Sequence, residues 1–219
     1  MSITLRAARR LRPAALVALL LLSACSSAYY SVMETFGVEK REILKDRVLE
    51  GRDDQEAAKD QFQTTLEAFK SATGFEGGDL EQTYGVLKNE LAECEDRAST
   101  VQGNIASIEK VAGDLFREWE AEAEQYSSED LRKRSRELLA DTQQRYAQLM
   151  AAMRKSESKM EPVLAGFRDQ VLFLKHNLNA QAIASLQANV LEIEDDIAVL
   201  IRDMEASIKE ADAFIQTLG

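Results

Sequence analysis

The sequence predicts an all-α protein, an elongated antiparallel bundle of four long helices with coiled-coil-like heptad seams. Helix-favouring residues such as Ala, Leu, Glu and Lys are abundant, and the 219 residues include only two prolines, Pro13 and Pro162. Apolar residues recur at alternating steps of four and three, which is the spacing of a heptad seam. Three short segments rich in Gly, Ser or Asn interrupt this spacing and divide the chain into four helices.

The first 24 residues do not fit the bundle pattern. A positively charged stretch, "MSITLRAARRLRP", precedes the apolar run "AALVALLLL", and the small residues of "SAC" follow. This is the layout of a secretory signal peptide, and the apolar run is too short to span a bilayer as a helix. We therefore divide the chain into a signal peptide (1–24), an N-terminal tether (25–29) and a helical bundle domain (30–219).

The end of this segment, "LSAC" from Leu22 to Cys25, resembles the lipobox of bacterial lipoproteins. The resemblance implies that diacylglycerol is attached to Cys25, that the chain is cleaved before Cys25, and that the new amino terminus is acylated. Ser26 stands where an Asp would imply retention in the inner membrane. The expected location is therefore the outer membrane of a Gram-negative bacterium, with the protein lipid-anchored and facing the periplasm.

The first helix is expected over residues 30–73 and the second over 79–126. "GFEGGD", residues 74–79, separates them, because its three glycines favour a helix end and its Asp can cap the next helix. Cys94 lies on the seam of the second helix, so we expect a small buried residue rather than a reactive thiol. If Cys25 carries lipid, Cys94 has no disulfide partner in the chain. The second seam comprises Leu80, Tyr84, Leu87, Leu91, Cys94, Ala98, Val101, Ile105, Ile108, Ala112, Leu115 and Trp119.

The third helix is expected over 128–177 and the fourth over 180–218. Ser127 stands three residues before Asp130, which predicts a weak capping box, and "HNLNA" supplies asparagines for the last turn. Strict up-down order then places the "GFEGGD" and "HNLNA" turns at one end and the "YSSED" turn and the C-terminus at the other. The apolar seam of the third helix includes Leu131, Leu138, Tyr146, Leu149, Met153, Met160, Leu164, Phe167, Val171, Leu174 and Leu178.

The charge of the chain excludes one class of partner. The net charge is −11, and removal of the four arginines of the signal peptide leaves 23 basic residues against 38 acidic ones, a net charge of −15. Such a chain is repelled by nucleic acid, so we expect no nucleic-acid binding. The basic "LRKRSRE" follows the acidic "EWEAEAEQYSSED" and should face it across a hairpin. This arrangement indicates either surface pairing or contact with lipid headgroups.

The sequence contains no catalytic motif. His176 is the only histidine, and we find no phosphate-binding loop, no ordered Ser-His-Asp set and no repeated Glu-x-x-His of a di-iron bundle. We therefore expect no enzymatic activity, no cofactor and no metal site. An alternative is a ligand-binding or enzymatic bundle that uses His176 together with Lys175, Asn177 and Asn179.

One stretch departs from the seam pattern. Residues 171–174 are four consecutive apolar residues, so this turn of the third helix is apolar on all sides. Either other helices cover every side, or the turn offers an apolar patch to an envelope protein. A second copy of the chain, packed through the seams as a homo-oligomeric coiled-coil scaffold, is a further alternative. The candidate docking residues are Leu172, Phe173, Lys175, His176 and Asn177.

Four blocks of the sequence resemble a known bacterial family. They are "YYSVMETFGVEKREILKDRV", "GGDLEQTYGVL", "LFREWEAEAEQYS" and "FRDQVLFLKHNLNA". The family is the domain of unknown function number 2959, and the resemblance covers most of the chain after the signal peptide. It implies a helical envelope protein, and it implies no activity and no functional residues.

Overall fold

The described part of the chain is helical except for its turns, which confirms the predicted fold class. The computed structural model describes residues 40–74, 80–177 and 179–218, and this part contains no strand. Each predicted helix end within these residues lies within three residues of the observed one. The helices are α2 (Lys40–Thr73), α3 (Leu80–Ala123), α4 (Glu129–His176) and α5 (Ala180–Leu218).

The chain divides into two compact units, and the arrangement described below concerns only residues 44–219. Of the other unit, residues 1–43, the described part is the first turn of α2. The predicted signal peptide, the tether with Cys25, and residues 30–39 of the predicted first helix lie outside the described residues.

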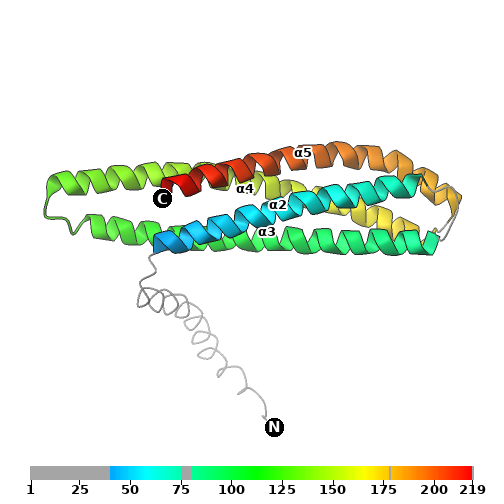
Figure 1. Ribbon diagram of the computed structural model, residues 1–219, viewed down its shortest axis with the longest axis horizontal. Helices are drawn as coiled ribbons and strands as arrows, with labels where there is room; N and C mark the ends of the chain where they lie inside the picture. Colours follow the sequence, from blue (N-terminus) through cyan, green and yellow to red (C-terminus); the bar gives the residue numbers. More distant parts are fainter. Residues whose placement is uncertain (1–39, 75–79, 178, 219) are drawn as a thin grey trace, which may run out of the picture. The chain divides into compact units, whose positions relative to one another are not determined.

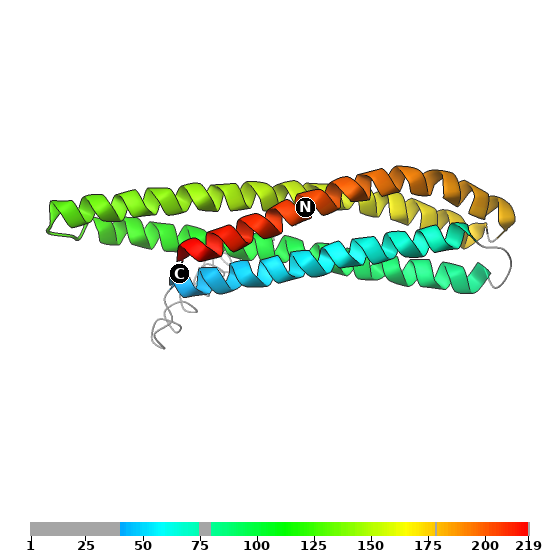
Figure 2. The same cartoon turned by 45° about the horizontal axis from the view of Figure 1, so that its top comes forward.

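Successive helices of the unit 44–219 run antiparallel (Figures 1 and 2). The end of α2, the start of α3 and the α4–α5 turn lie at one end, and the α3–α4 turn lies at the other, as the up-down order predicts. α4 packs closely against both α3 and α5. Two ion pairs hold α2 against α5: Arg52 contacts Asp212 at 2.9 Å, and Lys70 contacts Glu194 at 2.7 Å.

The cap of α4 corrects one prediction. Ser128, not Ser127, is the N-cap: its backbone is extended (φ −82°, ψ 118°), and its hydroxyl accepts a hydrogen bond from the Leu131 N–H at 3.4 Å. The prediction was displaced by one residue because two serines adjoin and either can supply the oxygen. At the other end of α4, the Asn177 N–H donates to the Leu174 carbonyl at 3.2 Å and ends the helix.

The predicted seams form the core. Cys94 is fully buried and unpaired, as predicted, and burial raises the pKa of its thiol to about 12. The Phe69 and Phe167 rings stack with centroids 4.7 Å apart and link α2 to α4 across the core. Of the twelve predicted seam positions of α3, the buried ones are Leu87, Leu91, Cys94, Val101, Ile105, Ile108, Ala112 and Leu115.

A small polar contact interrupts the apolar core near its middle. The Gln55 side-chain amide donates to the Ser156 hydroxyl at 3.2 Å, and both residues are almost completely buried. The Ser156 hydroxyl in turn lies 2.9 Å from the Met153 carbonyl and donates to it. Ser156, which breaks the apolar seam of α4 in the sequence, is therefore paired with a second buried polar group, as burial of a hydroxyl requires.

Two seam predictions are wrong. Leu131 and Leu138 of α4 are 50% and 61% exposed. Both belong to the first three turns of α4, next to the α3–α4 turn, and this end of the hairpin extends beyond the end of α5 (Figures 1 and 2). We call residues 117–140 the hairpin arm. Because α5 ends before this level, it does not cover this part of the seam.

No helix in the described ranges contains a stretch that is both apolar enough and long enough to cross a bilayer.

Candidate functional site

The predicted docking site lies in the last two turns of α4. Val171 and Leu174 point into the bundle and are 8% and 2% exposed, whereas Leu172 and Phe173 are 59% and 41% exposed. The turn that the sequence presents as apolar on all sides is therefore half covered. The other half forms an apolar patch on the surface.

The core fixes the position of this patch. Phe167, one to two turns before it, is fully buried in the stack with Phe69 of α2. Gln170 accepts a hydrogen bond from the Asn189 side chain of α5 at 3.1 Å. Contacts with two other helices thus hold the end of α4, so Leu172 and Phe173 are presented on a fixed backbone.

The polar candidate residues close the helix. Lys175 and His176 are exposed in the last turn of α4, where the helix dipole favours a cation. The side-chain amide of Asn177 donates to the Phe173 carbonyl at 2.9 Å. His176 and Asn177 are neighbours in the sequence. The Asn177 side-chain amide, however, caps the end of α4 and does not form a site with the His176 imidazole.

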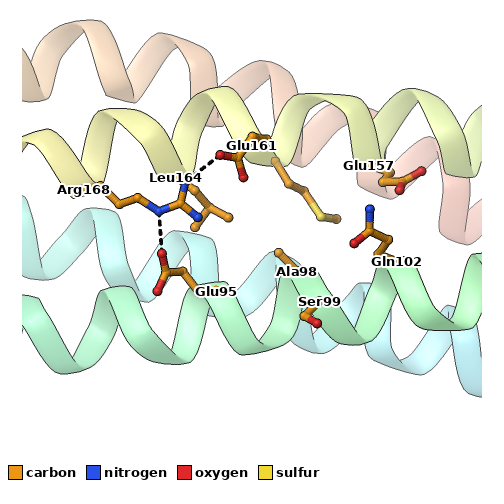
Figure 3. Close-up of a pocket in the computed structure, with 9 residues that line it drawn as sticks. Glu95, Ala98, Ser99, Gln102, Glu157, Glu161, Leu164 and Arg168 are labelled. Atoms are coloured by element: carbon orange, nitrogen blue, oxygen red, sulfur yellow. Dashed lines mark hydrogen bonds and ion pairs between the residues drawn. The ribbon is translucent and has the colours of Figure 1, made fainter. Parts of the chain in front are cut away.

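A groove runs between α3 and α4 (Figure 3). Its volume is about 220 Å³, and Ala98, Met160 and Leu164 supply its apolar lining. Polar residues complete the lining: Glu95, Ser99, Gln102, Glu157, Glu161 and Arg168.

The charges of this groove are mutually satisfied. The Arg168 guanidinium bridges Glu95 of α3 and Glu161 of α4, with N–O distances of 2.5 Å in each case (Figure 3). Its hydrogen bonds to Glu161 and Glu95 raise the pKa of Arg168. Glu157 accepts from Arg154 at 2.8 Å. Because each carboxylate already has a cation, the groove is better suited to holding α3 and α4 together than to binding a charged ligand.

A second groove lies between α2 and α5. It measures about 430 Å³, and Leu66, Ile197, Ala198 and Ile201 contribute apolar surface. The Lys70–Glu194 ion pair is part of its lining. Within the residues that the structure describes, no group of three or more His, Cys, Asp or Glu side chains is placed to hold a metal ion.

Most ion pairs of the acidic and basic clusters at the α3–α4 turn join residues three or four positions apart in α4. Arg136 pairs with Glu124 across the hairpin, and this contact lowers the pKa of the Glu124 carboxyl. Arg132 and Arg134 instead pair with acids one turn earlier in α4, Glu129 and Asp130, both at 2.9 Å. These are exposed pairs, and such pairs contribute little to stability.

The family model described as "Protein of unknown function (DUF2959)" matches residues 29–218, which include all four helices. The chain belongs to this family. The search of the curated proteins found no match. Membership confirms the resemblance of the sequence blocks, and Cys25 lies outside the matched range.

The structure of this DUF2959 chain also reveals exposed apolar residues that the seam pattern assigned to the core. Leu131 and Leu138 have the heptad spacing of buried residues, so their own positions give no signal of exposure. The lengths of the helices, in contrast, indicate that these residues are exposed. α3 and α4 have 44 and 48 residues, whereas α5 has 39, so antiparallel packing from a common end leaves the α3–α4 turn uncovered by α5.

Proposed function

We propose that the protein is a non-enzymatic lipoprotein of the bacterial outer membrane. Its lipid is on Cys25, and its helical bundle faces the periplasm and acts as a protein-binding module. The signal-peptide layout and the small residues before Cys25 support the anchor. The family match begins at residue 29, so Cys25 precedes the part of the chain that the family shares.

One observation carries the binding role: Leu172 and Phe173 are exposed on a helix end that the core holds in place. Large apolar side chains on a rigid element lose little conformational entropy on binding, which is typical of interface anchor residues. Lys175 and His176 adjoin them on the same helix end. The partner surface that fits is an apolar depression with acidic groups at its edge.

The anchor is tested by labelling cells with palmitate. The wild-type protein should incorporate the label and fractionate with the outer membrane, because a lipobox cysteine is acylated. The Cys25→Ser variant should lose the label, and the Cys94→Ser variant should keep it. Label that persists in Cys25→Ser would contradict the anchor assignment.

The docking role is tested by placing a photo-crosslinking amino acid at position 175 and irradiating cells. We expect a captured partner that the Leu172→Ser/Phe173→Ser variant no longer captures, although its circular dichroism is unchanged. The matched control is Leu191→Ser, because Leu191 is 64% exposed on α5. Capture that survives the double substitution contradicts the proposal, and loss of helicity in that variant would show that the two residues are part of the core.

A further inference from the structure

The groove between α2 and α5 has an apolar floor and is open to the surface. Leu66 of α2 and Ile197 of α5 form the bottom of this groove and are buried. Ile201 is half-buried on its side, and Ala198 is exposed at its edge. Because the side chain of Ala198 is a single methyl group, the two helices leave a volume of about 430 Å³ between them.

Two ion pairs join α2 and α5 along this groove. Lys70 contacts Glu194 at 2.7 Å, and Arg52 contacts Asp212 at 2.9 Å. The second pair stands 18 residues from the first on both helices, which is about 27 Å at 1.5 Å per residue. The two helices therefore run side by side over this length, and the groove between them is straight.

The margins of the groove are acidic. The residues that line it, together with those seven positions further towards Arg52 and Asp212, include five acids and two lysines. Both lysines are already paired, Lys59 with Glu56 at 2.6 Å and Lys70 with Glu194. The other three acids are exposed and form no ion pair within the described residues: Asp60, Glu67 and Glu205.

These three acids have the spacing of contacts along a helix. Asp60 and Glu67 are seven residues apart on α2, and Glu205 stands seven residues after Ala198 on α5. Seven residues of an α-helix are nearly two turns and about 10.5 Å long. A helix that lies along the groove therefore repeats its own face at the same interval, with an apolar stripe over the floor and charged residues over the margins.

We propose that this groove binds a basic amphipathic helix of a partner protein. The apolar side chains of that helix contact Leu66, Ala198 and Ile201, and its Lys or Arg side chains pair with the acids of the two margins. This surface lies on α2 and α5 and does not include the docking residues at the end of α4. The proposal therefore stands or falls independently of the docking role.

Charge argues against two other occupants of the groove. Residues 25–39 of the same chain contain Glu34 and Glu39 and no basic residue. A second copy of the chain has a net charge of −15 without its signal peptide, because 38 acidic residues stand against 23 basic ones. Either occupant would bring further acids to margins that are already acidic, whereas a basic helix compensates them.

The test is fluorescence anisotropy with a labelled designed peptide of two heptads that has Leu at a and d and Lys at e and g. The protein is the mature chain, residues 25–219 with Cys25→Ser. The Kd should be about 10–100 μM, because a contact of two heptads is small. Binding should weaken by roughly tenfold or more when Glu replaces Lys in the peptide, and it should weaken as salt is added. Absence of binding would overturn the proposal.

Two adjacent residues of α5 provide matched variants. Ala198 lines the groove, whereas Val199 is exposed and does not line it. Ala198→Lys should weaken binding of the Lys peptide by roughly tenfold or more, because it places a charged side chain over the apolar floor, and Val199→Lys should leave binding unchanged. Glu67→Lys/Glu205→Lys should weaken binding of the Lys peptide and strengthen binding of the Glu peptide. Equal effects of the two α5 substitutions would indicate unspecific attraction to an acidic protein and would overturn the proposal.

Methyl NMR locates the bound peptide. The signals of Leu66 and Ile201 should shift on titration, and shifts confined to Leu172 would place the peptide at the end of α4 and overturn the proposal. Displacement of the labelled peptide by an unlabelled peptide of residues 25–39 would assign the groove to the protein's own N-terminal segment. A dimer that the designed peptide dissociates would assign the groove to a second copy. Each of these two results would also overturn the proposal.

Discussion

Phe167 shows how much of the fold depends on a single side chain. Its ring is fully buried and stacks on Phe69, and the same helix end carries the exposed Phe173. Phe167→Ala should lower the free energy of unfolding by about 3–5 kcal/mol, because it leaves a cavity between α2 and α4. Phe173→Ala is the matched control and should change it by less than about 1 kcal/mol. Urea denaturation measures both values, and equal losses would contradict the assignment of Phe173 to the surface.

Cys94 should make the stability of the protein depend on pH in the alkaline range. Burial, together with the nearby Glu90 and Glu95 carboxylates, raises the pKa of its thiol from 9.0 to about 12. The folded chain therefore keeps the proton at a pH where the unfolded chain releases it. The contribution is complete below about pH 9 and is lost as the pH rises towards 12.

The measurement is the free energy of unfolding of the wild type minus that of Cys94→Ala at several pH values. Above pH 9 this difference should fall by about 1.4 kcal/mol per pH unit. A difference that stays constant between pH 8 and pH 11 would show that the thiol is not shielded from water in solution.

At the scale of the helices, two glycines in similar helical settings should respond in opposite ways. A Cβ atom on Gly51 of α2 would lie 3.0 Å from Ile108 Cδ1 and 3.6 Å from Met153 Cε, whereas a Cβ on Gly103 of α3 meets nothing within 4 Å. Gly103→Ala should stabilise the protein by about 0.5–1 kcal/mol, since Ala restricts the unfolded chain and favours helix. Gly51→Leu should destabilise it by about 1–3 kcal/mol through overpacking.

Thermal unfolding followed by circular dichroism compares the two substitutions. A stabilising Gly51→Leu would mean that α2 lies farther from α3 and α4 than the structure places it. The sequence alone did not distinguish the two glycines, because the distance between packed helices is set by side chains of three different segments.

The helices themselves were largely predictable. Their ends follow from local signals, such as the glycines after Thr73 and the asparagines after His176, and these signals act over a few residues. The choice between Ser127 and Ser128 as the cap of α4 was not predictable, because it depends on which residue takes the extended backbone at the turn.

At the scale of the whole unit 44–219, the arm and the rest of the bundle differ in the number of packed helices. Trp119, the single tryptophan of the chain, lies in the arm and reports its structure. The fluorescence midpoint of the wild type in urea should fall below the midpoint from circular dichroism, because α5 does not cover the arm and the arm therefore opens at lower cost than the core. Coincident midpoints would contradict this expectation and show that the arm unfolds with the bundle.

The candidate docking site was predictable only in part. The four consecutive apolar residues 171–174 drew attention to the end of α4, but the sequence left open whether they were covered. The structure shows Val171 and Leu174 in the core and Leu172 and Phe173 at the surface. That separation depends on which sides of α4 face other helices, and helical spacing within one segment does not contain this information.

The amino-acid sequence by itself determined the helical class, the four segments, the phase of their seams and the burial of Cys94, because each follows from spacing within one helix. Only the tertiary structure decided where the seams are covered. Leu131 and Leu149 share one helix face, yet one is half exposed and the other is completely buried. The physical reason is that burial requires a second helix at the same level, and the lengths and register of all four helices together determine whether one is there.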